Sequence, residues 1–266
     1  MADITIVDRP DDPRFAQFRL NERGLASRAE KRDDAGAGHF LAEGDLVVER
    51  ALDAGCTPTA ALVDPDRVPA VADRLAADGA PVYGGGDEVR RVVSGLGMAQ
   101  SIIALFERPA RPSVGELARR CERLVVVEGV DNPANVGGIV RNAAGLGWDG
   151  IVLDHTSADP LARRALRVSM GTAFSLPHAR TTRLAEELRA LDGYELYAMT
   201  PDAASIPLDS VTPGDRIAVL IGSERAGLSD ELVQLATPVH IPMAAGVDSL
   251  NAAAASAVAC WALGPH

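Results

Sequence analysis

The chain has 266 residues, of which 47% are hydrophobic and 24% charged, a composition typical of a globular protein with room for two domains. Its formal net charge of −11 argues against a non-specific nucleic-acid binder, which needs a basic surface. No run of about eighteen apolar residues occurs, and the first residues lack the basic and apolar regions of a signal peptide, so we expect a cytoplasmic protein with no membrane partner.

The first part of the chain alternates short apolar runs with helical patterns, which predicts an α/β layer domain of about a hundred residues. We place this domain at residues 1–108. Its expected strands are 40–44, 60–64, 81–86 and 101–106, and its expected helices are 45–53, 67–77 and 88–94. Two prolines in a charged, weakly periodic stretch indicate a linker at residues 109–120.

The second part, residues 121–266, repeats the alternation with longer elements. Its expected strands are 123–129, 150–154, 174–178, 195–199, 217–222 and 237–242, and its expected helices are 136–146, 161–169, 184–191, 229–235 and 250–263. Strands made largely of Val, Ile and Leu between helices predict a parallel sheet covered on both faces. Ligands bind at the carboxyl ends of such strands, so we expect a site in the loops after residues 129, 199, 222 and 242.

Cysteines and charge clusters restrict the function further. Cys56, Cys121 and Cys260 have no CxxC or CxxH spacing, so we expect neither a metal site nor a disulfide. Residues 14–32 carry six positive charges against two acids, and residues 160–183 carry five arginines and no acid. Each of these stretches is either an RNA contact or a solvated helix surface, and the sequence alone leaves both open.

The loop after residue 129 has the sequence VDNPANVGGIVRNA. Asn135 can cap the helix that follows. Capping does not explain Gly137 and Gly138, which each cost a helix roughly 1 kcal/mol relative to alanine and allow another backbone or a substrate to come close. Arg141 follows less than two turns after Asn135, so its guanidinium either returns toward the same helix end or lies on the surface.

The loop after residue 222 has the sequence GSERAGLS, in which Ser229 is explained as a helix cap. Glu224 lies between two glycines at the carboxyl end of a buried strand. It is either a functional carboxylate or an acceptor for the N–H groups of its own loop.

The last loop, IPMAAGVDSLN, leads into an alanine-rich helix. Ser249 and Asn251 flank Leu250 at the start of this helix, where backbone N–H donors lack partners. One of the two as the N-cap leaves the other unassigned. The small residues that follow permit close packing against a neighbouring element.

Together, the three loops resemble the three motifs of the SpoU/TrmH family of RNA ribose 2'-O-methyltransferases. The segments NPANVGGIVRNA, IGSERAGLS and IPMAAGVDSLNAAAASA match in this order, over roughly residues 123–263. The resemblance implies the α/β SPOUT fold, with a parallel sheet and a C-terminal deep trefoil knot. It also implies a homodimer through the catalytic domain and S-adenosylmethionine (AdoMet) as methyl donor, with no metal.

The resemblance also implies roles for single residues. The catalytic group is Asn135, Arg141, Glu224, Ser249 and Asn251. The donor contacts are Thr200, Gly222, Ile241, Met243 and Leu250, among which the glycine lets the chain approach the adenosine. The family's proposed base is the arginine of the first motif, but a guanidinium pKa above about 12 makes a free base scarce. We therefore expect Arg141 to bind phosphate or stabilise the alkoxide, and the proton acceptor stays open.

One position departs from the family pattern. The family commonly has glycine two residues after the methionine of the third motif, and here that position is Ala245, followed by Gly246. If the loop needs a positive φ at this point, Ala245 costs energy and alters the donor pocket unless Gly246 makes the turn.

The first part of the chain, with GHFLAEGDLVVERALDAGCTPTAALVD, is similar to the ribosomal-protein-like substrate-binding domain that precedes such catalytic domains. We expect RNA contacts at Arg23, Arg28, Arg163, Arg164 and Arg167. The expected function is 2'-O-methylation of ribosomal RNA. The alternatives are methylation of transfer RNA and a non-catalytic RNA-binding or ribosome-assembly factor, against which the presence of all five catalytic candidates argues.

Overall fold

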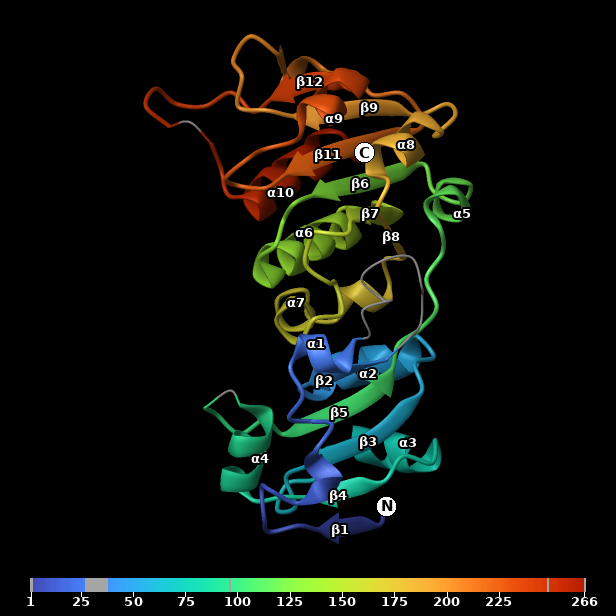
Figure 1. Ribbon diagram of the computed structural model, residues 1–266, viewed down its shortest axis with the longest axis vertical. Helices are drawn as coiled ribbons and strands as arrows, with labels where there is room; N and C mark the ends of the chain where they lie inside the picture. Colours follow the sequence, from blue (N-terminus) through green and yellow to red (C-terminus); the bar gives the residue numbers. More distant parts are fainter. Residues whose placement is uncertain (1, 27–37, 96, 248, 266) are drawn as a thin grey trace. The chain divides into compact units, whose positions relative to one another are not determined.

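The computed structural model describes residues 2–26, 38–95, 97–247 and 249–265 (Figure 1). The chain divides into two compact units, one of residues 1–110 with 161–174 and one of residues 111–160 with 175–266. In the part of the chain that is described, no helix is long and apolar enough to cross a membrane.

The first unit is built on a five-stranded sheet with the order β1-β4-β3-β5-β2. β5 runs antiparallel to both of its neighbours, whereas β1, β4 and β3 are parallel. The strands are β1 (Ile4–Ile6), β2 (His39–Glu43), β3 (Pro58–Val63), β4 (Val82–Gly84) and β5 (Ile102–Glu107); the helices are α1 (Glu22–Leu25), α2 (Asp45–Asp53), α3 (Val71–Ala77) and α4 (Asp87–Ser94). The sequence did not predict β1, because three residues are too few to show a period.

Residues 161–174 pack with the first unit, although they follow β7 of the second unit along the chain. This segment contains α7 (Arg163–Val168) and a 3-10 turn, Thr172–Phe174. Nε of Arg163 donates to the buried carboxylate of Glu43 at 3.0 Å, and the ring of Phe174 lies 5.4 Å from that of Phe40. The segment completes the core of the first unit from within the range 121–266 that the sequence assigned to the second.

The second unit is built on a seven-stranded sheet with the order β10-β12-β9-β11-β6-β7-β8. Every pairing in it is parallel, which confirms the prediction from the Val, Ile and Leu runs. The strands are β6 (Arg123–Glu128), β7 (Gly150–Asp154), β8 (His178–Thr181), β9 (Glu195–Met199), β10 (Ile206–Pro207), β11 (Ile217–Gly222) and β12 (Thr237–His240); the helices are α5 (Val114–Ala118), α6 (Pro133–Gly145), α8 (Leu184–Arg189), α9 (Asp230–Leu235) and α10 (Ala252–Ala262).

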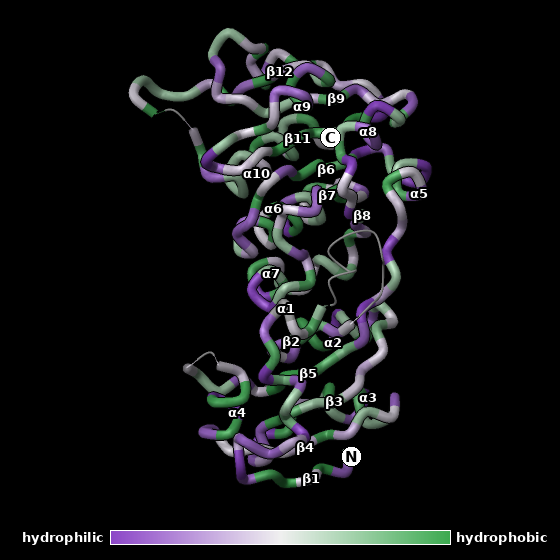
Figure 2. The backbone as a smooth tube through the Cα atoms, in the orientation of Figure 1, coloured by the Kyte–Doolittle hydropathy of each residue, from purple (hydrophilic) through white to green (hydrophobic). Residues whose placement is uncertain are grey.

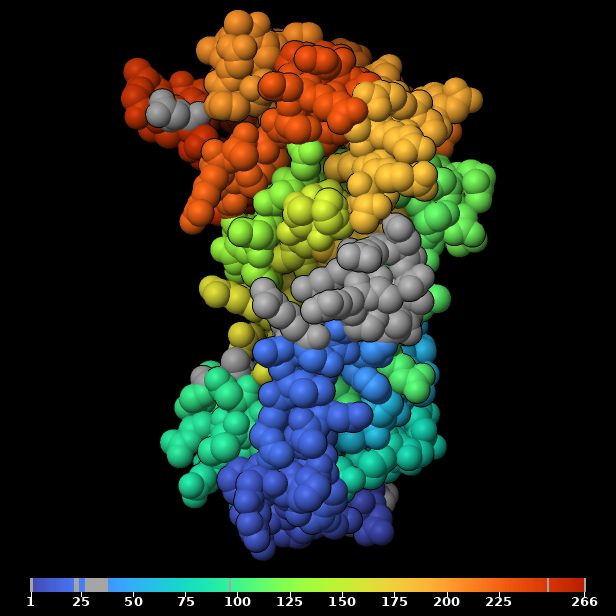
Figure 3. All heavy atoms as spheres, viewed as in Figure 1, coloured from blue at the N-terminus to red at the C-terminus, as the bar shows by residue number. Residues whose placement is uncertain are grey.

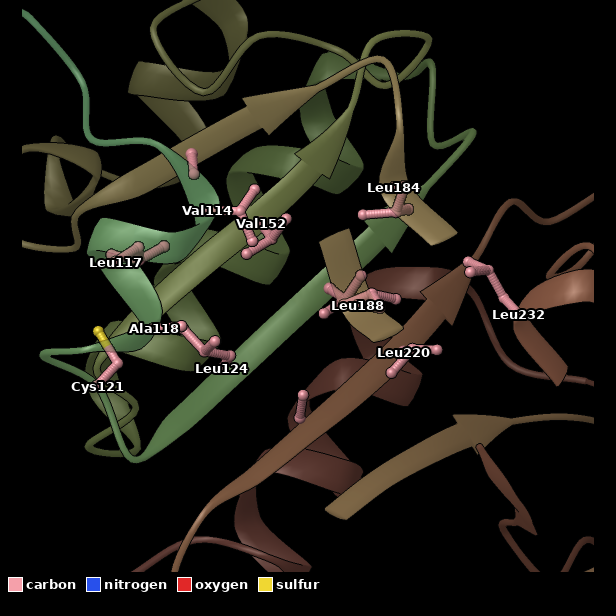
Figure 4. Close-up of a cluster of buried hydrophobic side chains, with 13 residues drawn as sticks. Val114, Leu117, Ala118, Cys121, Leu124, Val152, Leu184, Leu188, Leu220 and Leu232 are labelled. Atoms are coloured by element: carbon pink, nitrogen blue, oxygen red, sulfur yellow. The ribbon is translucent and has the colours of Figure 1, made fainter. Parts of the chain in front are cut away.

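The central strands of this sheet are apolar between their ends, as the hydrophobic colouring of β6, β7 and β11 shows (Figure 2). Their side chains alternate between the two faces. On one face they meet α5, α8 and α9 in a cluster that includes Leu117, Leu124, Val152, Leu188, Leu220 and Leu232 (Figure 4). The helices α6 and α10 pack against the sheet outside this cluster. Helices therefore cover both faces of the central strands, whereas Ile206 of the outer strand β10 is 45% exposed.

Two short elements differ from the sequence-based expectation. The strand expected at 174–178 is β8, which begins at His178, because Phe174 ends a turn of the first unit and Pro177 lacks a ladder N–H. The expected linker contains α5, which begins with a capping box: Oγ of Ser113 accepts from N of Glu116 at 3.3 Å, and Oε2 of Glu116 accepts from N of Ser113 at 2.9 Å. The pattern Ser-x-x-Glu was a usable signal for this helix.

The C-terminal helix α10 packs closely on α6, more than a hundred residues away in the chain. A Cβ atom at Gly138 of α6 would lie 2.7 Å from Cβ of Ala253, so a larger residue there would push the helices apart. Nδ2 of Asn142 donates to the carbonyl of Ala253 at 2.7 Å and to Oγ of Ser256 at 2.9 Å. This confirms the close approach predicted from the glycines and alanines, while the knot stays a prediction from the resemblance.

Candidate active site

The loops named by the sequence meet at the carboxyl edge of the seven-stranded sheet. β12, β9, β11 and β6 are consecutive and parallel, so the residues that end them lie side by side. Gly222 ends β11, Thr200 directly follows β9, and Ile241 directly follows β12. Three of the five expected donor contacts are therefore at neighbouring strand ends.

Three polar side chains from the three motifs form one hydrogen-bonded cluster at this edge. Nδ2 of Asn135 donates to Oε1 of Glu224. Nδ2 of Asn251 donates to Oδ1 of Asn135 at 3.1 Å and to Oε1 of Glu224 at 3.4 Å. These residues come from α6, from the loop after β11 and from the start of α10, so the fold brings together side chains as many as 116 positions apart.

Asn135 reaches the cluster because it does not cap its helix. α6 begins at Pro133, three residues earlier than predicted, and Oδ1 of Asn132 accepts the N–H of Ala134 at 3.0 Å as its N-cap. The prediction of Asn135 as a possible cap was therefore wrong. Proline is favoured at the first helical position, and this was the missed signal for the start of α6.

Asn251 both caps its helix and joins the cluster. Its Oδ1 accepts the backbone N–H groups of Ala253 at 2.9 Å and Ala254 at 3.4 Å, while its amide nitrogen faces Asn135 and Glu224. Capping fixes the orientation of the amide, because the oxygen is held by the helix and only the nitrogen points into the site. Asn251 is thus both the N-cap of α10 and a member of the polar cluster.

The loop that carries Glu224 folds back over the end of its own strand. A Cβ atom at Gly222 would lie 2.2 Å from the carbonyl carbon of Gly227, so glycine is required by the loop itself and not only by a ligand. Gly227 has a φ of +69°, and its N–H donates to the carbonyl of Ser223 at 2.9 Å. Ser229 then caps α9 as predicted, with Oγ 3.4 Å from N of Leu232.

The other expected catalytic residues, Arg141 and Ser249, lie outside the three-residue cluster. Arg141 is on α6, six residues after Asn135, with an exposed side chain. Ser249 is exposed and directly precedes Leu250, and no hydrogen bond joins it to the cluster in the described residues.

The loop after β12 presents apolar side chains to solvent and projects from the unit at residues 241–247 (Figure 3). Met243 is 36% exposed and Leu250 is 39% exposed. Gly246 has a φ of +85°, whereas Ala245 is not among the described residues with positive φ. The turn is therefore made by Gly246, and Ala245 adopts a conformation that alanine tolerates.

Comparison with known proteins agrees with this geometry. The sequence profile of the SpoU rRNA Methylase family matches residues 122–261, which include all three motif loops. The chain belongs to the SpoU rRNA methylase family. It is 39% identical over 268 aligned residues to an uncharacterized tRNA/rRNA methyltransferase of Mycobacterium tuberculosis, covering 97% of this chain and 91% of that protein.

Two other similar proteins carry more specific names. A 23S rRNA (adenosine(1067)-2'-O)-methyltransferase of Streptomyces azureus is 36% identical over 162 residues, covering 59% of each chain. The crystal structure of an AdoMet-bound rRNA methyltransferase from Sinorhizobium meliloti superimposes with a TM-score of 0.82 at 26% identity, covering 98% of this chain and 97% of that one. The α/β fold of this SpoU protein is thus the fold of known methyltransferases.

The arginines predicted to bind RNA have varied surroundings in this SpoU protein. Arg163 and Arg167 both contact Glu43, with Nη1 of Arg167 3.6 Å from Oε2 of that glutamate. Arg164 is exposed. Arg23 lies in α1, and Arg28 lies outside the described residues. Two of the five guanidiniums therefore already share one buried carboxylate.

Two carboxylates that the sequence analysis did not single out support the site. Glu128 ends β6 and accepts two hydrogen bonds from Ser229. Asp154 ends β7, where burial acts to raise its pKa, but hydrogen bonds from Ser157, Thr156 and the N–H of Gly129 outweigh burial and lower it. An acid at the end of an apolar strand, directly before a loop, was the available signal for both residues.

Proposed function

We propose that this protein transfers a methyl group from AdoMet to a ribose 2'-hydroxyl of ribosomal RNA, in the cytoplasm. The observation that carries the proposal is the Asn135–Glu224–Asn251 cluster, which joins the three SpoU motifs in one place beside the strand ends of Thr200, Gly222 and Ile241. The activities for which the Streptomyces azureus and Sinorhizobium meliloti relatives are named support ribosomal RNA as the substrate.

The residues at this edge fit AdoMet. Met243 and Leu250 are apolar side chains with more than a third of their surface in solvent, which suits walls for an adenine ring. AdoMet supplies a methyl group already activated on a sulfonium, so the transfer needs no Lewis acid. The relative from Sinorhizobium meliloti binds AdoMet and shares the fold along nearly the whole chain.

The chain's own groups would place and polarise the ribose. The cluster presents amide and carboxylate groups of fixed orientation, and fixed positioning supplies a large part of the rate gain in a group transfer. Arg141, exposed on the same helix as Asn135, would bind a phosphate or stabilise the developing alkoxide. Comparison of Arg141→Lys with Arg141→Ala tests this: a rate near wild type in the alanine variant would remove Arg141 from the mechanism.

A second copy of the chain would cover the exposed face of α10. Val258 is 37% exposed and Trp261 is 64% exposed, and at a spacing of three residues they share one helix face. Sedimentation of Trp261→Glu should give half the wild-type mass, whereas Val92→Glu, at an equally apolar exposed position on α4 of the first unit, should leave the mass unchanged. Equal masses for wild type and Trp261→Glu would contradict this interface.

The decisive experiment maps 2'-O-methyl groups in total RNA from cells with and without the protein. One ribosomal RNA nucleotide should lose its methyl group and regain it with wild-type protein but not with Glu224→Gln. Loss of a methyl group from a transfer RNA instead would show that the substrate is transfer RNA. Unchanged RNA, together with no AdoMet binding by calorimetry, would leave a non-catalytic RNA-binding factor.

A further inference from the structure

The carboxylate that ends β6 lies directly beside the active-site loop. Glu128 is the Cα partner of Gly222 on the neighbouring strand. Its Oε2 accepts the backbone N–H of Ser229 at 2.7 Å, and its Oε1 accepts the hydroxyl of Ser229 at 2.9 Å. Two hydrogen bonds to separate oxygens of one carboxylate restrain Ser229 in both position and orientation.

These bonds fasten the far end of the loop that carries Glu224. The near end is fixed by the chain at Gly222, where the loop folds back so tightly that no Cβ atom fits. The middle is closed by the bond from N of Gly227 to the carbonyl of Ser223. Apart from Glu128, the hydrogen bonds that hold the loop are bonds within it or within the first turn of α9, such as that from N of Ala226 to Oγ of Ser223, and the bonds of Glu224 to Asn135 and Asn251.

We infer that Glu128 is a positioning residue for methyl transfer: by anchoring Ser229 it holds Glu224 against Asn135 and Asn251. The inference rests on the proposed function and adds to it the device that keeps the three-motif cluster assembled. A glutamine at position 128 is a poor substitute, because it keeps one acceptor oxygen for the two donors of Ser229 and its amide nitrogen is itself a donor.

Kinetics of Glu128→Gln in a labelled-AdoMet assay on extracted ribosomal RNA test the inference. The transfer rate should fall about tenfold or more, the loss that removal of a charged hydrogen bond gives, with AdoMet affinity within threefold of wild type. Ser229→Ala, which keeps the backbone bond, should lose less. Glu122→Gln, an exposed acid beside the start of the same strand, is the matched control and should match wild type.

A double variant separates positioning from general stability. If Glu128 acts through Glu224, Glu128→Gln should cause no further loss in a Glu224→Gln background. Multiplied losses would overturn the inference, and so would an unchanged rate in Glu128→Gln alone.

A second readout does not depend on activity. Amide hydrogen exchange of the peptide containing residues 223–229 should be faster in Glu128→Gln than in wild type, with the rest of the second unit unchanged. Unchanged exchange would overturn the inference. Suppose that exchange is faster in Glu128→Gln but the wild-type protein transfers no methyl group. The proposed function would then be rejected, and the role of Glu128 in holding the loop would be supported.

An independent inference concerns the other charged side chain of this loop. Arg225 follows Glu224 directly and is exposed, and within the described ranges it makes neither a hydrogen bond nor an ion pair. Its situation contrasts with that of Arg163 and Arg167, which share the carboxylate of Glu43. On a chain with a net charge of −11, a cation without a counter-charge beside the active site favours an anionic ligand.

We propose that Arg225 contacts a backbone phosphate of the RNA next to the target nucleotide. This proposal also rests on the proposed function. It adds an RNA contact in the second motif to those expected in the basic stretches 14–32 and 160–183. A phosphate contact orients the substrate without reading its sequence.

The salt dependence of binding to extracted ribosomal RNA tests this contact. Arg225→Gln should reduce the slope of log K against log salt by about 0.7 to 0.9, the value for one phosphate. Arg120→Gln, an exposed arginine at the opposite edge of the same sheet, should keep the wild-type slope. An unchanged slope in Arg225→Gln would overturn the contact. If the slope is reduced but the wild-type protein has no transferase activity, the phosphate contact is supported and the proposed function is rejected.

Discussion

Two groups of polar side chains at opposite edges of the seven-stranded sheet bond to different partners. At the amino edge, Asp149 and Arg216 bond to backbone groups: Oδ2 of Asp149 accepts the N–H groups of Glu122 and Arg123, each at 2.8 Å, and Nη2 of Arg216 donates to the carbonyl of Ala118 at 2.6 Å. At the carboxyl edge, the cluster side chains bond to one another.

The difference separates stability from function on one scaffold. A side chain that satisfies a buried or terminal backbone group stabilises the chain whether or not a ligand is present. Polar side chains that satisfy one another can exchange those partners for a ligand, and preorganised groups of this kind are typical of active sites. Changes at the two edges should therefore affect different measurements.

The largest effect is expected for Asn135→Ala at the carboxyl edge. It removes the donor to Glu224 and the acceptor for Asn251, so the transfer rate should fall about 100-fold, as for other preorganised donors. Asn132→Ala is the matched control, because it removes only the cap of α6 and should cost about 1 kcal/mol of stability. Equal rates for the two variants, measured per folded molecule, would mean that the bonds of Asn135 to Glu224 and Asn251 are not needed for transfer.

Gly222→Ala should disturb both properties, because this glycine serves the fold and the site together. The added Cβ atom would overlap backbone atoms of Gly227 and Leu228, so the loop must move, at a cost of about 2 kcal/mol. Gly145→Ala is the control: no atom lies within 4 Å of its Cβ position. Urea unfolding measures the stability, and a normal rate in Gly222→Ala would show that the loop's position is unimportant.

Asp149→Ala should affect stability alone. It leaves two N–H groups at the start of β6 without their acceptor, and the free energy of unfolding should fall by about 1 kcal/mol. The transfer rate per folded molecule should stay at the wild-type value. Asp215→Ala, an exposed acid at the same edge with no hydrogen bond among the described residues, should change neither quantity.

The smallest effect concerns pH. Because the folded pKa of Asp154 is lowered, its contribution to stability is present above the unfolded pKa of about 3.9 and is lost as pH falls through the folded value. Unfolding measured from pH 6 to pH 3 should therefore show a shallower decline in Asp154→Asn than in wild type. Parallel curves would mean that the hydrogen bonds from Ser157 and Thr156 do not favour the charged form.

The sequence predicted the long strands and the motif residues well, because each had a strong local signal. The runs at β6, β7, β9 and β11 are apolar and bounded by polar residues, so their period and limits could be read directly. The resemblance to the three family motifs implied five catalytic residues, and the structure joins three of them, Asn135, Glu224 and Asn251, by hydrogen bonds.

What the sequence could not show depends on contacts between distant residues. Arg163 looked like a free cation, because its partner Glu43 is 120 positions away. The position of Glu128 and Asp154 at strand ends was visible in the sequence, but their bonds to neighbouring loops were not. Asn132 and Asn135 were equally good caps by type, and only the backbone decided between them.

The docking of residues 161–174 on the first unit means that the chain passes between its two units three times, after residues 110, 160 and 174. The first unit is therefore built from two separate stretches of the chain, and cleavage at a single point cannot separate the two units. A fragment ending at residue 110 would keep Glu43, buried in the native unit, but lose the cations that neutralise it, and would open Phe40 to water. Gene fusions and domain exchanges in this architecture have to carry the 161–174 segment along with the first unit, or rebuild its partner surface.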